Sequence, residues 1–244
     1  MEAQNLLWTS GWDSTFRLLY LIFIEKKTVQ PIYIVDESRR SLNKELQAID
    51  CILKIIEKKH PNATKLVLPF IKFDKKEISV KQSIAENFAF LKSKTKIGGQ
   101  YEWLSLFCEQ NNLKKVELCI EKDAITSSFF NFIYPYIHSQ KEDNEYSPEE
   151  LKLKNAVFTV FNYFEFPLFE TNKIEMYEIA KENNWLEIME LTWFCHTPKK
   201  GIPCGKCNPC QTTIMKGLGF RVPFKNRMKG YIKIYKKKVK LMLR

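Results

Sequence analysis

Strand and helix patterns alternate along the first half of the chain, and this alternation restricts the fold more than any other feature. Apolar or β-branched runs predict strands at 5–8, 28–35, 65–73 and 115–120. Helical spacing predicts helices between them, at 15–25, 41–59 and 102–111. Strands that are separated by helices pair in parallel through right-handed crossovers. The sequence therefore predicts an α/β fold in which helices cover both faces of a parallel sheet.

Two further helices are expected in the second half of the chain. Ser147 is a capping residue, Pro148 suits the first helical turn, and Glu150 follows at the spacing of a helix start. A second helical pattern covers 171–184, beyond an acidic, exposed loop at 140–150.

The segment Thr9-Ser10-Gly11-Trp12-Asp13-Ser14 lies between the first expected strand and the first expected helix. A tight turn of small residues exposes backbone N–H groups, and the helix that follows adds its positive end, so the segment can bind a phosphate group. The hydroxyl groups are further donors, while Asp13 is expected to cap the helix or bind Mg²⁺. An ordinary strand-to-helix turn with a capping residue is the alternative.

Four cysteines near the C-terminal end, Cys195, Cys204, Cys207 and Cys210, have the spacing C-x₈-C-x₂-C-x₂-C. Four thiolates at such spacing are typical of a structural Zn²⁺ site that has no open position. An iron–sulfur cluster and metal-free reactive cysteines are the alternatives, although ferredoxins space their fourth cysteine differently. His196 is interpreted as a bystander, because the side chains of neighbouring residues diverge.

The remaining cysteines, Cys51, Cys108 and Cys119, lie in apolar contexts and are expected in the core. Seven cysteines, an odd number, suit a reducing compartment better than a disulfide framework. The longest strongly apolar run, 18–24, is too short to cross a bilayer. We therefore expect a cytoplasmic protein without a membrane partner.

The positive charge is concentrated at one end of the chain. The formal net charge is +11, yet no acidic residue follows Glu190, and 191–244 contain 14 Lys and Arg. The preceding 190 residues hold 25 basic and 28 acidic residues and are slightly negative. Two hypotheses stay open for the basic end, a solvated amphipathic end and a docking element for a nucleic acid or an acidic protein.

Together the two motifs indicate a family. The 9–14 segment resembles the S-G-G-x-D-S pyrophosphate loop of the N-type ATP pyrophosphatases, and the cysteine spacing after Leu191-Thr192-Trp193 resembles that of the 7-cyano-7-deazaguanine synthase family. Asp36–Arg40 falls where that family carries Asp-Tyr-Gly-Gln-Arg, and Asn172–Glu175 resembles its Thr-Lys-x-Glu segment. The resemblance implies a Rossmann-like, adenine nucleotide alpha hydrolase-like domain over 1–220 with a Cys₄ zinc knot at 191–215, followed by a basic extension at 221–244.

The resemblance also implies an activity. An ATP-dependent carbon–nitrogen ligase of this type adenylates the carboxylate of 7-carboxy-7-deazaguanine, then amidates and dehydrates it to 7-cyano-7-deazaguanine. Its partners would be ATP with Mg²⁺ and a 7-deazapurine carboxylate, the zinc being structural. By resemblance, Asp13 and Ser14 would be catalytic, and ATP would contact these two together with Thr9, Ser10, Gly11, Trp12, Asp36 and Arg40.

Other functions stay open at this point. A relative from antiphage defence, outside queuosine biosynthesis, would ligate the adenylate to an amine of a protein or nucleic acid docked at the basic end. A non-catalytic zinc module that binds nucleic acid is a third hypothesis, and a homodimer is also left open. The chain departs from the family in three places, the first being Gly98-Gly99-Gln100, around which the family's usual Arg-Asn pair is missing. Residues 124–129 replace its Ser-Gly-Tyr-Pro-Asp-Cys substrate segment, and Ser10 replaces the first glycine of its loop, so we expect the φ angle of Ser10 to be negative.

Overall fold

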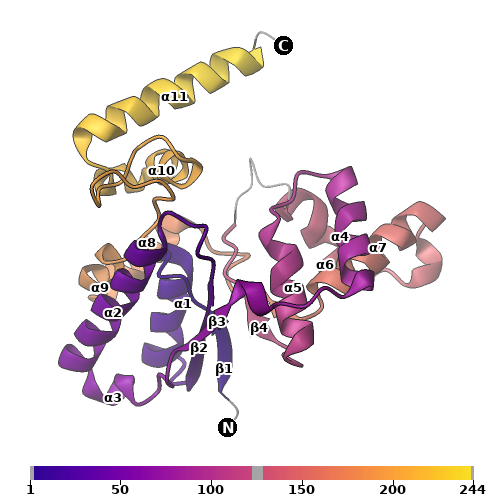
Figure 1. Cartoon of the computed structure of the whole chain (residues 1–244), viewed down its shortest axis with the longest axis horizontal. Helices are drawn as coiled ribbons and strands as arrows, with labels where there is room; N and C mark the ends of the chain where they lie inside the picture. The colour runs from indigo at the N-terminus through magenta and orange to yellow at the C-terminus, as the bar shows by residue number, and fades with distance from the viewer. Residues whose placement is uncertain (1–2, 123–128, 243–244) are drawn as a thin grey trace.

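Five strands form one parallel sheet in the order β3-β2-β1-β4-β5, as seen in the computed structural model (Figure 1). The structure describes residues 3–122 and 129–242, so all of the substituted segment 124–129 except its last residue lies outside the described residues. The predicted α/β fold with a parallel sheet is confirmed. The strands are β1 (Gln4–Leu7), β2 (Val29–Val35), β3 (Ile71–Asp74), β4 (Val116–Glu117) and β5 (Phe164–Glu165), the last of which was not predicted.

Helices cover both faces of the sheet, as the sequence predicts. Successive strand residues point to opposite faces, so Leu6 and Tyr33 join one core cluster while Leu7 and Ile32 join the other. The first face carries α1 (Trp12–Phe23), α2 (Leu42–Lys59), α8 (Lys173–Glu182) and α9 (Leu186–Glu190). The second carries α4 (Gln82–Lys94), α5 (Gln100–Gln110) and α7 (Pro148–Phe161), and the short helices α3 (Pro61–Thr64) and α6 (Tyr134–Ile137) lie at the periphery.

Local capping explains where two of these helices begin. The Ser147 side chain accepts from the backbone N–H of Glu150, whose carboxylate accepts from the N–H of Ser147. Asn172 and Glu175 make the same reciprocal arrangement at the start of α8. Each capping box satisfies N–H groups that a helix start leaves unpaired, so the predicted start at Ser147 is confirmed.

A buried ion pair ties α1 to the sheet. The Arg17 guanidinium donates through Nε and Nη2 to the two carboxylate oxygens of Glu117 on β4, at 2.7 and 2.6 Å. Such a two-pronged, charge-assisted contact restricts orientation as well as distance. The start of α1 is thereby held at the edge of the sheet where β1 and β4 end.

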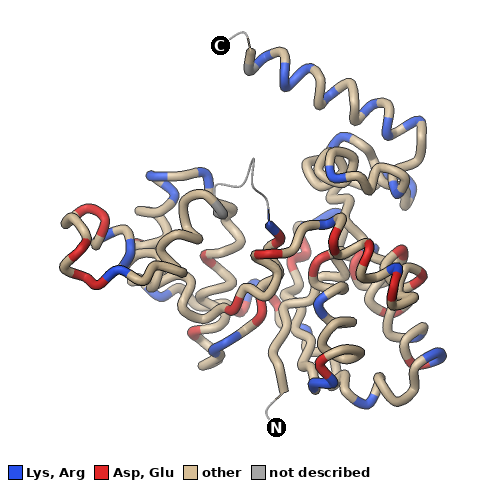
Figure 2. Tube along the Cα trace, turned by 180° about the vertical axis from the view of Figure 1, so that it is seen from behind, with Lys and Arg blue, Asp and Glu red and all other residues tan. Residues whose placement is uncertain are grey.

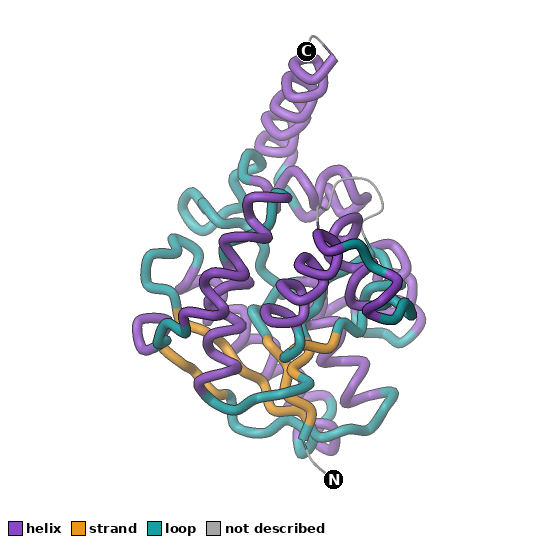
Figure 3. Tube along the Cα trace, turned by 90° about the vertical axis from the view of Figure 1, so that its right-hand side faces the viewer, coloured by secondary structure: helices purple, strands orange, loops and turns teal. Residues whose placement is uncertain are grey.

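The C-terminal segment that contains the cysteines lies above the sheet and its covering helices in Figure 1. Helix α10 (Asn208–Thr213) belongs to a small cysteine-containing lobe, and α11 (Phe224–Met242) packs on it and then projects away (Figures 1 and 3). Figure 2 shows Lys and Arg along α11 and no acidic residue there, in agreement with the sequence. Among the described helices, none has the length and apolar character needed to cross a membrane.

One prediction about the core is wrong. Cys51 is exposed, because the buried face of α2 passes through Ala48, Ile49 and Ile52 and leaves position 51 on the solvent side. Cys108 is fully buried as expected, whereas Cys119 is only partly buried.

Candidate functional site

The phosphate turn, residues 9–14, joins β1 to α1. Trp8 Nε1 donates to Thr15 Oγ1 at 3.0 Å and so links the residues on either side of the turn. Gly11 is the N-cap of α1, and no side chain caps the helix. The first N–H groups of the 12-residue helix are therefore left for an anion. The predicted capping role of Asp13 is wrong, because its carboxylate contacts the Lys173 ammonium instead.

Ser10 has a backbone conformation that the sequence analysis did not expect. Its φ angle is 55°, in the left-handed region, so the prediction of a negative φ is wrong. This region costs an L-residue about 1–2 kcal/mol. The conformation is held by complete burial of Ser10 and by a 2.9 Å hydrogen bond from the backbone N–H of Trp193 to the Ser10 carbonyl oxygen. Within the described chain, the Ser10 hydroxyl has no hydrogen-bond partner.

A charge cluster lies beside the turn. The Lys173 ammonium contacts Asp13 and lies 3.0 Å from Glu121 Oε1, and Lys216 Nζ lies 2.7 Å from the same oxygen. Burial opposes the charge on Lys173, but the Asp13 and Glu121 carboxylates raise its pKa. Burial and the nearby Asp13 carboxylate raise the pKa of Glu121, against the opposite effect of the two lysines. The cluster thus balances two carboxylates against two ammonium groups.

Two cavities meet at the phosphate turn. The first cavity, of about 400 Å³, is bounded by α10, Trp12, Phe194 and Arg221. We call it the zinc-side cavity, because α10 belongs to the lobe that contains the four predicted zinc ligands. The sheet-side cavity, of about 350 Å³, lies at the ends of β1, β2 and β4 and is bounded by aliphatic side chains and Trp103. Both volumes fall in the range of small-molecule sites. The residues that line both cavities are Thr9, Gly11, Asp13, Arg39 and His196.

Arg221 is a buried cation on the zinc-side wall. Its guanidinium carbon lies 4.9 Å from the ring centroids of both Trp12 and Phe194. Its Nη2 donates to the Thr192 carbonyl at 2.6 Å and to the Thr192 hydroxyl at 2.7 Å. Burial lowers the pKa of Arg221 to about 10, so the group is positive at neutral pH.

The structure brings most of the predicted turn residues to the cavities. Thr9, Gly11 and Asp13 line both, Trp12 lines the zinc-side cavity, and Ser14 lines the sheet-side cavity, whereas Ser10 lines neither.

Asp36 and Arg40 also lie outside both cavity walls. Asp36 accepts from Lys75 Nζ at 2.7 Å, and Lys75 together with Ser38 lowers its pKa against the opposing effect of burial. Arg40 is exposed, whereas its neighbour Arg39 lines both cavities, and Arg39 Nη2 lies 2.9 Å from Oε1 of Glu45 on α2.

Sequence reasoning selected neither Arg39 nor Lys173 as a site residue, and it also missed His196, Arg221, Glu121 and Lys216. His196 was interpreted as a bystander, yet it lines both cavities. Its position directly after Cys195 gave no such signal, because the turn lies far away in the chain. Arg221, Glu121 and Lys216 carry no local signal either, because their partners lie far away in the chain.

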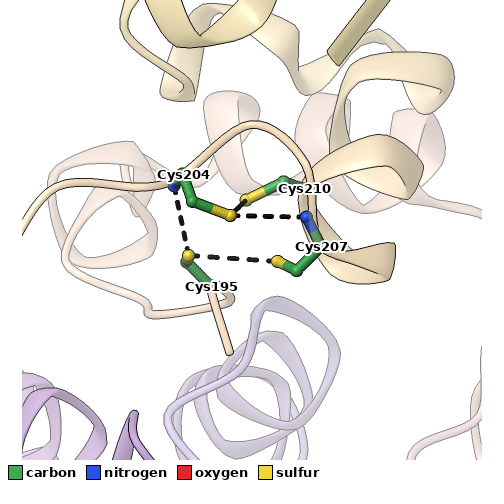
Figure 4. A group of neighbouring side chains, drawn as sticks. All are labelled: Cys195, Cys204, Cys207 and Cys210. Carbon is green, nitrogen blue, oxygen red and sulfur yellow. Dashed lines mark hydrogen bonds between the residues drawn. The ribbon is translucent and has the colours of Figure 1, made fainter. Parts of the chain in front are cut away.

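The four predicted metal ligands gather at one point (Figure 4). Their sulfur atoms all lie within 4.8 Å of one another, with 4.0 Å between Cys204 and Cys210 and 3.9 Å between Cys195 and Cys207. Zinc–sulfur bonds of about 2.3 Å put tetrahedral sulfurs about 3.8 Å apart. Backbone N–H groups of Lys206 and Cys207 also point at the Cys204 sulfur, at 3.3 Å each. The cluster therefore fits a tetrathiolate zinc ion.

The comparisons with known proteins agree with this arrangement over part of the chain. The model of the family described as queuosine biosynthesis protein QueC matches residues 145–218, which include α7, α8 and all four cysteines. A search of curated proteins gives no significant match. The parallel α/β sheet and the cysteine cluster are both consistent with this family. The resemblance inferred from the sequence is thus confirmed over 145–218, where the chain is similar to QueC-type queuosine biosynthesis proteins.

Proposed function

We propose that the protein uses ATP to activate the carboxylate of 7-carboxy-7-deazaguanine and converts it to 7-cyano-7-deazaguanine. The observation that carries this proposal is the meeting of two cavities at the phosphate turn, where Thr9, Gly11 and Asp13 line both. A reaction between two bound molecules needs adjoining sites with the reacting atoms at a shared wall. The match to a family named for queuosine biosynthesis supports a deazapurine as one of the two molecules.

The sheet-side cavity suits the nucleoside of ATP. Its position beyond the carboxyl ends of β1, β2 and β4 is where α/β sheets bind nucleotides, since the chain turns in opposite directions from β1 and β4. The phosphates would then lie at the turn and the uncapped start of α1. The zinc-side cavity, with Trp12, Phe194 and Arg221 on its walls, is left for the deazapurine.

The chemistry requires no protein nucleophile. A carboxylate oxygen of the substrate attacks the α-phosphorus of ATP, the bond to pyrophosphate breaks, and an acyl-adenylate forms. The lone pair of ammonia then attacks the acyl carbon, AMP leaves, and an amide remains. A second ATP activates the amide oxygen in the same way, and loss of AMP and of the amide protons gives the nitrile. The protein contributes orientation and positive charge, for which Lys173, Arg39 and Arg221 line the zinc-side cavity.

Asp13 and Ser14 are the proposed catalytic residues. Mg²⁺ prefers oxygen ligands and commonly binds one carboxylate together with phosphate oxygens. The Asp13 carboxylate lines both cavities and would hold Mg²⁺, which neutralises charge on the phosphates. The zinc would hold the loop of 191–215 in shape and take no part in the reaction, because four thiolates leave no open position. We assign this activity to residues 1–220, which include the cysteine-containing lobe.

A second candidate function has its own support. Helix α11 carries eight Lys and Arg and no acidic residue between Phe224 and Met242. It packs against α10, and α10 residues Asn208, Thr212 and Thr213 line the zinc-side cavity. A polyanion bound along α11 would therefore lie beside the proposed deazapurine cavity. The position of this basic helix favours a ligase like the relatives from antiphage defence, in which an amine of a nucleic acid or protein replaces ammonia.

One set of incubations separates these functions. The protein is mixed with 7-carboxy-7-deazaguanine, ATP and Mg²⁺, with and without ammonia, and with and without cellular RNA and protein. AMP together with the nitrile, detected by chromatography and mass spectrometry, supports the first function. AMP without nitrile, together with added mass on a macromolecule, supports the second. If no AMP forms under any condition, both are wrong and a non-catalytic zinc module remains.

A further inference from the structure

The two oxygens of the Glu121 carboxylate differ in their hydrogen-bond partners. Glu121 follows β4 and is about nine-tenths buried, on the wall of the zinc-side cavity. Both Lys173 and Lys216 contact its Oε1, at 3.0 and 2.7 Å. Its Oε2 is buried and has no hydrogen-bond partner among the residues that the structure describes. A buried acceptor in this state costs free energy until a donor reaches it.

The missing partner of this oxygen must be a hydrogen-bond donor. Phosphate oxygens at neutral pH carry negative charge and accept hydrogen bonds, so the carboxylate repels them. An N–H group satisfies a carboxylate oxygen with a charge-assisted bond. The two lysines contact Oε1 and hold the carboxylate in place, which leaves Oε2 as a fixed acceptor for an N–H group of the ligand.

The other walls of this cavity suit a flat, polar ring. Trp12 and Phe194 provide aromatic surface, and the Arg221 guanidinium lies against both of their rings. The indole N–H of Trp12 is also buried and, within the described chain, lacks an acceptor. The cavity thus combines aromatic surface, a buried acceptor oxygen and a buried donor. A guanine-type ring matches these features with two N–H donors on one edge and a carbonyl oxygen beside them.

We infer that Glu121 Oε2 accepts hydrogen bonds from the N1–H and 2-amino edge of a guanine-type base in the zinc-side cavity. The inference rests on the proposed function, which puts the deazapurine there. It makes Glu121 the residue that selects guanine-type over hypoxanthine-type rings. A carboxylate supplied from the end of β4 would then read the base in a chain that lacks the family's Ser-Gly-Tyr-Pro-Asp-Cys segment.

The test compares two ligands by isothermal titration calorimetry: 7-carboxy-7-deazaguanine and the same molecule without its 2-amino group. We expect wild-type protein to bind the guanine form about 10- to 100-fold more tightly, because the deaminated ring loses a hydrogen bond to a charged group. In Glu121→Gln the preference should fall below about threefold. A general loss of packing would weaken both ligands equally and leave the ratio unchanged.

Glu45→Gln is the matched control. Glu45 lies on the same cavity wall, but its oxygens already have Tyr33, Ser41 and Arg39 as partners, so the variant should keep the wild-type preference. An unchanged ratio in Glu121→Gln, or a wild-type protein without preference, overturns the inference. If the variant does not fold, the wild-type comparison still overturns the inference when it shows no preference for the guanine form.

AMP release measured in parallel distinguishes this inference from the proposed function. AMP formation without any ring preference overturns only the role of Glu121. A Glu121-dependent preference without AMP formation overturns only the proposed reaction. Absence of binding to either ring overturns both.

Discussion

The backbone N–H of Trp193 donates a 2.9 Å hydrogen bond to the carbonyl oxygen of Ser10. Trp193 also donates from its indole Nε1 to the carbonyl oxygen of Cys195, at 2.9 Å. One residue therefore connects the phosphate turn to the first cysteine of the metal cluster. Because a bound zinc would hold the Cys195 sulfur, it would also restrict Trp193 and, through it, the conformation of Ser10.

We first predict that loss of zinc loosens the phosphate turn. Cys207→Ser removes one thiolate, so the protein should lose its zinc and part of its solubility. Amide hydrogen exchange of peptides covering 8–14 and 191–196 should then become at least about tenfold faster, and AMP release should fall. Cys51→Ser is the control, since Cys51 is exposed on α2 and should change none of these. A soluble, zinc-free, fully active Cys207→Ser protein would contradict the structural role of the metal.

The second prediction concerns Asp13→Asn. We expect AMP release to fall by at least about 100-fold, because the carboxylate that lines both cavities is lost. The fold should survive, since Lys173 keeps its contact with Glu121. Chromatographic measurement of AMP, with thermal unfolding followed by circular dichroism, checks both parts. Asp50→Asn, on the exposed face of α2 in a pair with Lys54, should match wild type. Unchanged turnover in Asp13→Asn would show that the site is wrongly assigned.

Local patterns predicted the elements on which the site is built. The strand–turn–helix at 5–25, the helix start at Ser147 and the cysteine spacing each depend on residues close in sequence, where propensity and capping decide the outcome. The predicted strands at 65–73 and 115–120 are shorter in the structure, and β5 was missed. Each of these pairs through only two to four residues, too few for a recognisable alternation.

Long-range pairing was beyond the reach of the sequence pattern. Lys173 meets Asp13 across 160 positions, and Lys216 meets Glu121 across 95. Nothing in the local sequence indicates such partners, because they are set by how α8 and the cysteine lobe pack over the end of the sheet. The conformation of Ser10 was predicted wrongly for the same reason, since its hydrogen-bond donor, Trp193, lies 183 positions away in the chain.

The third prediction concerns Ser10→Gly. Glycine adopts a positive φ at little steric cost, and the substitution also removes a buried hydroxyl that lacks a partner in the described structure. The free energy of unfolding should rise by about 0.5–1 kcal/mol in urea denaturation, part of the gain being lost to the greater flexibility of glycine in the unfolded chain. Ser10→Ala is the control, because it removes the hydroxyl but keeps the left-handed strain. If Ser10→Gly is less stable than Ser10→Ala, the φ angle is not the source of the strain.

The fourth prediction tests the close contact between α11 and the cysteine-containing lobe at Gly205. Gly205 has a φ of +76°, and a Cβ atom there would lie 1.9 Å from the carbonyl oxygen of Asn226 in α11. Gly205→Ala should therefore destabilise the protein by about 2–4 kcal/mol, through left-handed strain and a clash with backbone that cannot rotate away. Urea denaturation measures this loss, and limited proteolysis should cut α11 more readily. Gly99→Ala, where a Cβ meets no atom within 4 Å, should shift stability by less than about 0.5 kcal/mol. Equal stability of the two variants would mean that α11 does not rest on Gly205.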